Sequence, residues 1–236
     1  KRAEAVGNAE LFVEPLKGGE NIYKTRVNAP RFDCDFYSTG NAARTCVGQT
    51  KTRTVREPMF QSASNGQQTI TGDKLNATFS ESPNELSTLV VAGNGKFTEL
   101  ERNVTAATIA FTTSTGVVAL RGGEPTAWDN SSRAKAKEID WDSKAKRSYL
   151  RGKVSTTYYS KRTAGEAVPF SDSGKPVFVT SDAAEFDHAA EVAVFTGNAR
   201  GWQDDNFVRA NKLTILQKEG RFLGDGNVQS TIYDAK

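Results

Sequence analysis

The chain has 236 residues, enough for one large domain or two small ones. Hydrophobic residues make up 37% of it, and no apolar run approaches the roughly eighteen residues that a membrane-spanning helix needs, so no such helix is expected. Lys and Arg number 31 against 28 Asp and Glu, and the two signs are interleaved along the chain, which argues against nucleic acid as a partner.

Residues suited to metal binding or nucleophilic catalysis are scarce. The chain has one histidine, His188, and two cysteines, Cys34 and Cys46. These cannot supply the four ligands of an ordinary zinc site, and a catalytic triad could use only His188. We therefore expect no metal, no cofactor and no enzymatic activity. The chain begins at Lys1 without a signal sequence, and we expect any export signal or anchor to lie outside it.

A repeated pattern runs through the chain: an alternating strand, a polar turn, a second alternating strand and a glycine. The first 60 residues hold degenerate units, with a half unit at Gly7 and a fuller one closing at Gly40 and Asn41. Clear copies then begin near residue 69 and span 73–94, 106–122, 136–152, 181–199 and 210–228. Their closing glycines recur at steps of 29, 30, 45 and 29 residues, and the long step predicts an insertion at about residues 161–175.

Within each copy, apolar residues recur two positions apart and polar residues lie between them. This period predicts β-strands with one buried and one solvated face. The turns expected between paired strands include Ser82 to Asn84, Thr115 with Gly116, and Glu219 with Gly220. Residues 131–149 are rich in helix formers, but the repeat predicts a strand, a turn and a strand there instead.

A single strand pair cannot bury its own apolar face, so the units must stack. The closing glycines suit sharp bends or bulges at which a strand passes from one sheet to another. The sequence therefore predicts one all-β domain over residues 1–236. Its expected architecture is an elongated, twisted β-jelly-roll, in which stacked strand–turn–strand repeats form a V-shaped double sheet.

The inward apolar positions are candidates for the lining of a groove between the sheets. Dense packing in a filled core is the alternative for any one of them, because a solid sandwich has the same periodicity. These candidates are Leu75, Phe79, Val91, Ile109, Phe111, Leu120, Ile139, Trp141, Leu150, Phe186, Phe195, Leu213, Ile215 and Phe222.

The order of motifs in the C-terminal part resembles a known family. Gly174, Lys175 and Pro176 precede an alternating strand, and two further segments, 195–199 and 211–213, follow in the same order as in the LptA or OstA-like proteins. The resemblance is best over about residues 174–233 and recurs more weakly from residue 69. Members of that family are periplasmic β-jelly-rolls of lipopolysaccharide transport, whose V-shaped sheets enclose the acyl chains of lipid A.

The resemblance implies a function, a compartment and partners. It implies a periplasmic protein that shields lipopolysaccharide acyl chains on the way to the outer membrane. It also implies that exposed edge strands, here around Gly7–Leu11 and Val228–Tyr233, join copies of the chain or other bridge components by strand addition. Three features depart from the family pattern: the chain is longer, its first 60 residues fit poorly, and the two cysteines have no counterpart.

Cys34 and Cys46 lie twelve positions apart in a predicted hairpin or corner. In an oxidising periplasm a disulfide is the expected state, and two buried free thiols are the alternative.

Two other functions stay open on the residues alone. One is a self-associating structural β protein with a tightly packed interior. The other is a carbohydrate-active enzyme that uses a carboxylate pair, either Asp140 with Asp142 or Asp204 with Asp205.

Overall fold

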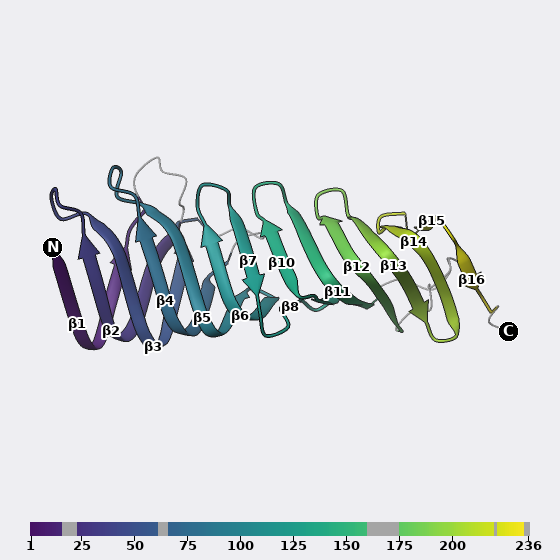
Figure 1. Ribbon diagram of the computed structural model, residues 1–236, viewed down its shortest axis with the longest axis horizontal. Coiled ribbons are helices and arrows are strands. Elements are labelled where there is room, and N and C mark those ends of the chain that lie inside the picture. The colour runs from purple at the N-terminus through teal and green to yellow at the C-terminus, as the bar shows by residue number, and fades with distance from the viewer. Residues whose placement is uncertain (16–22, 61–65, 160–174, 220, 234–236) are drawn as a thin grey trace. The chain divides into compact units, whose positions relative to one another are not determined.

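The computed structural model describes residues 1–15, 23–60, 66–159, 175–219 and 221–233, and in these ranges the regular structure is β-strand. In Figure 1 the successive long strands of each part of the chain lie side by side. The strands are β1 Arg2–Val13, β2 Tyr23–Phe36, β3 Ala43–Pro58, β4 Gln68–Phe79, β5 Leu86–Glu99, β6 Arg102–Thr112, β7 Val117–Arg121, β8 Thr126–Trp128, β9 Ser132–Lys135, β10 Glu138–Asp142, β11 Arg147–Tyr159, β12 Pro176–Asp187, β13 Val192–Gln203, β14 Asn206–Leu216, β15 Arg221–Asp225 and β16 Gln229–Thr231.

The predicted all-β jelly-roll of stacked strand–turn–strand repeats is confirmed. Successive long strands pair antiparallel, and turns join them at residues 82–84 and 115–116, as predicted. Residues 131–149 form strands rather than a helix, because the strand pairings of the repeat outweigh the local helix propensity. The predicted insertion at about 161–175 lies almost wholly outside the described residues.

The strands form two compact units, Lys1–Gly123 and Glu124–Lys236. In unit 1 the strand order is β1-β2-β3-β4-β5-β6-β7. In unit 2 it is β10-β11-β12-β13-β14-β15, with β9 beside β11, β8 beside β9 and β16 beside β14. The prediction that residues 1–236 form a single domain stays a prediction.

Most long strands carry a bulge part-way along, where the register shifts and the chain bends. In β5 the bulge residues are Gly93 and Asn94, with φ of 76° and 52°, and the Asn94 amide donates to Asp73 Oδ2 at 2.9 Å. In β13 the same geometry recurs at Gly197, φ 75°, where Asn198 donates to Asp182 Oδ2 at 2.8 Å. Glycine suits these positions because it tolerates positive φ without a steric penalty. The closing glycines of the repeat are therefore corners, as predicted.

The segment at Gly40 and Asn41, predicted as a hairpin or a corner, is the hairpin turn between β2 and β3. The bend of β3 lies at Thr50 and Lys51, whose φ values are 62° and 58°. A corner without glycine carries no signal that the repeat pattern could detect. The degenerate unit therefore continues through Gly40 as an uninterrupted hairpin.

The bends divide each unit into two layers that share an interior. In unit 1, layer A holds the strand halves that carry Cys46, Leu75 and Val91, and layer B holds the halves that carry Val27 and Ile70. All five side chains are buried in one hydrophobic cluster. In unit 2, layer A correspondingly holds the halves with Leu150, Phe195 and Leu213, and layer B those with Val154 and Val179, all at most 2% exposed.

The described residues contain no helix that is both long and apolar enough to cross a membrane. They also contain no group of three or more His, Cys, Asp or Glu side chains placed to hold a metal ion.

Candidate functional site

The predicted groove-lining residues point into the interiors of the two units, but they differ in exposure. Ten are buried, and they fill the cores: Leu75, Phe79, Val91, Ile109, Leu120, Ile139, Leu150, Phe195, Leu213 and Ile215. Four stay partly exposed: Phe111, Trp141, Phe186 and Phe222. Whether any of them contacts a ligand stays a prediction.

The interior of unit 1 is filled near its corner. A Cβ atom added to Gly72 in layer B would lie 2.2 Å from Val91 Cγ1 in layer A. A Cβ on Gly48 would lie 2.8 Å from the Phe32 ring. These distances are far below van der Waals contact, so the glycines are present because side chains already occupy the space.

Gly201, in layer B of unit 2 and farther from its bend, is less crowded than Gly72. A Cβ atom on Gly201 in layer B would meet Val208 at 3.6 Å and Leu213 Cδ1 at 3.9 Å, which are ordinary van der Waals distances. The position therefore has room for a methyl group.

The partly exposed candidates of unit 2 belong to one row in layer A, beside the hairpin turns and far from the bends. Strand register places the members opposite one another on successive strands, and paired residues share a face. We call this set the rim row: Trp141, Ser148, Phe186, Ala193, Ile215 and Phe222. Three of the six are aromatic and partly exposed, so the rim row is the apolar edge of the unit 2 interior.

Contacts within layer A hold the rim row in place. The Phe186 ring packs edge-on against the buried Phe195 ring, with centroids 5.7 Å apart. On its other side it lies 6.4 Å from the His188 ring, and His188 Nε2 lies 2.7 Å from Ser148 Oγ. The lone histidine is thus placed as a neighbour of the rim row, in the turn after β12.

In layer B of unit 1, at the end of the strands far from the bends, four polar side chains stand opposite one another on β3 to β6. We call Arg56, Gln68, Glu99 and Arg102 the polar ladder. Arg56 Nη1 donates to Gln68 Oε1 at 2.8 Å, and Gln68 Nε2 donates to Glu99 Oε1 at 2.9 Å. Arg102 Nη1 lies 3.7 Å from Glu99 Oε2, whose side chain is 3% exposed.

The polar ladder reaches across the unit 1 interior. The Arg56 guanidinium lies 4.5 Å from the centroid of the Tyr23 ring and 5.5 Å from that of Phe111, a residue of layer A. Burial lowers the pKa of Arg56, while Tyr23 and Glu99 act in the opposite direction. Burial also raises the pKa of the Tyr23 hydroxyl, and the Glu99 charge adds to that effect. Phe111 therefore faces a cation, which is poor surroundings for a hydrocarbon chain.

The sequence pattern missed the polar ladder. Its members are spaced 12, 31 and 3 positions apart, so no short motif links them. Only the strand register brings them together. A detectable signal existed at Gln68 and Glu99, because polar residues there interrupt positions that the strand period assigns to the interior.

The predicted pairing of the cysteines is present in the structure. Cys34 and Cys46 stand opposite each other on β2 and β3, with Cα atoms 4.1 Å apart, and form a disulfide bond. The bond closes the end of the unit 1 interior beside β1.

Three of the four carboxylates considered for a carbohydrate-active enzyme contact basic side chains or backbone N–H groups. Asp140 Oδ2 accepts from Arg151 at 2.6 Å, and Asp142 Oδ1 accepts the backbone N–H groups of the next turn. Asp204 Oδ2 lies 2.6 Å from Lys175 Nζ, and Asp205 is an exposed turn residue. These contacts stabilise strand pairs and turns.

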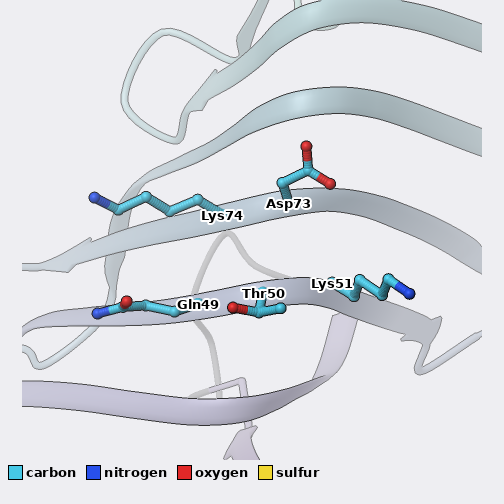
Figure 2. A pocket seen from close by; sticks show the side chains of 5 residues that line it. All are labelled: Gln49, Thr50, Lys51, Asp73 and Lys74. Carbon is cyan, nitrogen blue, oxygen red and sulfur yellow. The ribbon is translucent and has the colours of Figure 1, made fainter.

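A shallow depression lies on the outside of the unit 1 corner (Figure 2). Its volume is about 340 Å³, and Gln49, Thr50 and Lys51 of β3 line it together with Asp73 and Lys74 of β4. The lining is polar and all five residues are exposed. Acyl chains would gain nothing there, so the depression is not part of the candidate site.

Comparisons with known proteins find similarity to solved structures. No family model matches the chain, and no curated protein matches it. A solved structure that is similar is LptH from Pseudomonas aeruginosa, described as the LptA-homologous periplasmic component of the lipopolysaccharide transport device. The two are 12% identical, with a TM-score of 0.47, over 56% of this chain and 95% of LptH. At this TM-score the likeness carries no argument about function, which has to come from the chain's own geometry.

Proposed function

We propose that the chain is a lipid carrier that shields the acyl chains of lipopolysaccharide, with the unit 2 interior as the binding site. The rim row supports this proposal, because Trp141, Phe186 and Phe222 face the interior and yet stay partly exposed. Each CH₂ group taken out of water contributes about 0.8 kcal/mol. Acyl chains laid along the rim row would cover its aromatic rings and leave the charged head group in water.

The proposal places the protein in the periplasm, where the lipid must cross water to reach the outer membrane. The disulfide fits this compartment, because such bonds persist in oxidising surroundings. We propose no catalytic step.

Strand addition is the proposed way in which the chain joins copies of itself or other bridge components. Among the described residues, β1 pairs only with β2, and β15 and β16 pair only with β14. A strand paired on one side offers free N–H and C=O groups to another chain. Val6 and Tyr233, 72% and 64% exposed, lie at these two ends.

Site-specific photo-crosslinking tests the lipid proposal. A benzophenone amino acid at Trp141 or Phe186, followed by incubation with purified lipopolysaccharide and irradiation, should give a lipid-linked product. The matched control is Lys212, an exposed residue of β14 in the same layer whose side chain points outward. Phe111 serves as a second comparison, because the polar ladder faces it.

Each outcome bears on the proposal. Capture at Trp141 and Phe186 but not at Lys212 supports it. Capture at Lys212 alone, or equal capture at all positions, would rule out the unit 2 interior as the site. Stronger capture at Phe111 than at Phe186 would move the site to unit 1 and contradict the role given to the polar ladder.

A further inference from the structure

A second feature of unit 2 lies on the outward face of layer B, away from the interior. Strand register aligns six residues on six successive strands of that layer. We call this set the outer aromatic row: Trp128, Arg133, Thr157, Phe178, Trp202 and Phe207. The buried residues Val177, Val179 and Gly201 alternate with Phe178 and Trp202 along β12 and β13, so the row faces outward.

Four of the six members are aromatic, and their rings lie close to one another and to arginines. The Phe178 and Trp202 rings stack with centroids 5.4 Å apart and planes 21° apart. The Arg200 guanidinium lies 5.5 Å from the Trp202 centroid and 5.6 Å from that of Phe207. At the other end of the row, Arg133 lies 5.9 Å from the Trp128 ring. All four rings are partly exposed.

Cations border the row. Arg200 stands opposite Arg209 on the neighbouring strand, on the same face. In the part of the chain that the structure describes, no carboxylate forms an ion pair with Arg133, Arg200 or Arg209. Many other arginines of this protein do have such partners; Arg147 and Arg151, for example, each contact two carboxylates. The face therefore combines apolar rings with Arg200 and Arg209, which form no ion pair with a carboxylate of the described residues, whereas the charge of Arg133 acts on the Glu124 carboxyl and helps to lower its pKa.

We propose that this face binds an anionic polysaccharide of the uronic-acid type. Flat aromatic rings offer an apolar surface to the C–H faces of pyranose rings, and a guanidinium matches a carboxylate with two parallel hydrogen bonds. Adjacent strands are about 4.8 Å apart, so the rings of Phe178, Trp202 and Phe207 form a platform that crosses the strands. The site is independent of the lipid proposal, because it lies on the opposite face of layer B from the interior.

Charge density favours a polysaccharide over nucleic acid. Nucleic-acid sites gather many cations along a backbone that carries a charge at every phosphate, whereas this face presents Arg133, Arg200 and Arg209 and the whole chain has a net charge of +3.

Isothermal titration calorimetry with polygalacturonate at low salt tests the proposal. The protein should bind it, and hydroxyethyl cellulose, which is neutral, should bind more weakly. Replacing both cations, as Arg200→Gln with Arg209→Gln, should weaken binding roughly tenfold, and Trp202→Ala should do the same. Trp202→Phe should retain most of the affinity, because a flat ring remains.

Lys212→Gln is the matched control for lost charge, since Lys212 is an exposed cation of β14 beyond its bend. It should leave the affinity unchanged. Circular dichroism should confirm that every variant is folded before it is titrated. Absence of binding to polygalacturonate would overturn the proposal, and so would binding that Trp202→Ala does not weaken. Equal or tighter binding of single-stranded DNA would assign the face to nucleic acid instead.

Discussion

Unit 1 crosses its interior with charged and polar side chains, from Arg56 to Arg102, and ties its first strands together with a disulfide. Unit 2 has no cysteine, and the inward positions of its layer B hold Val154, Val177 and Val179 together with the buried, uncharged polar residues Thr156 and Gln203. Both units are built from the same bent antiparallel strands. The comparison teaches that one strand pattern accepts different side chains at a few interior register positions, a charged ladder in unit 1 and valines with uncharged polar residues in unit 2.

The two units can be followed separately, which makes the comparison testable. All three tryptophans, Trp128, Trp141 and Trp202, belong to unit 2. Tryptophan fluorescence therefore reports the unfolding of unit 2, whereas far-UV circular dichroism reports both units. A change that affects unit 1 alone should move only part of the dichroism transition.

Removal of the central carboxylate of the polar ladder should have the largest effect. Glu99→Ala removes the acceptor of Gln68 Nε2 and the carboxylate whose charge opposes that of the buried Arg56, and an uncompensated buried charge costs about 3–5 kcal/mol. In urea titrations, the dichroism transition of unit 1 should shift to much lower urea, while the fluorescence transition stays in place. Glu101→Ala, at an exposed neighbouring position, should change stability by less than about 0.5 kcal/mol. An equal shift of the fluorescence transition would mean that the units do not unfold independently.

Loss of the disulfide should have the next largest effect, again confined to unit 1. The bond closes a loop across 12 positions, for which chain entropy predicts about 3 kcal/mol. Cys34→Ser combined with Cys46→Ser should therefore lower the urea midpoint of unit 1 by that free energy. A reductant should do the same to the unchanged protein and nothing further to the double variant. If the reductant shifted the double variant as well, the loss could not be assigned to this bond.

The sequence predicted the features that recur and missed those that depend on register. Period-two alternation and the closing glycines predicted the strands and most corners, because each leaves a local trace. The corner at Thr50 and Lys51 left none. The polar ladder and the outer aromatic row are formed by residues far apart in the chain, and their alignment follows from bulges whose positions shift the register.

The candidate site was predicted only in part for a related reason. Alternation identifies which residues face inward, and the fourteen candidates do so. It does not say how far the opposite layer is. The Gly72 position is closed by Val91 and the Gly201 position is open, yet both are glycines in strands with the same period. Local packing of this kind can be read only from coordinates.

Two glycine substitutions test the spacing directly and should have intermediate effects. Gly72→Ala forces a methyl group to 2.2 Å from Val91 Cγ1, and overpacking of this kind costs about 1–3 kcal/mol. Gly201→Ala meets only contacts of 3.6 Å or more, so its stability should change by less than about 1 kcal/mol, in either direction. Urea titrations measure the change in the free energy of unfolding, followed by dichroism for Gly72→Ala and by fluorescence for Gly201→Ala. A costly Gly201→Ala would show that the space beside Gly201 cannot take a methyl group.

The smallest effect concerns acid. Burial acts to raise the pKa of Asp129 in unit 2, but hydrogen bonds from Ser131 and Ser132, with both backbone N–H groups at 2.7 Å, outweigh it and lower the pKa below the ordinary 3.8. A carboxyl whose pKa is lowered by folding stabilises the protein above its ordinary pKa, and that contribution is lost as the pH falls through the folded value. Solvent reaches this carboxylate, so the loss should be only a few tenths of a kcal/mol. Fluorescence-detected urea midpoints should fall less steeply below about pH 4 in Asp129→Asn than in the unchanged protein. The control is Asp205→Asn, in an exposed turn of the same unit, which should leave the dependence of the urea midpoint on pH unchanged. If Asp129→Asn left that dependence unchanged as well, the acid sensitivity of unit 2 would belong to other carboxylates.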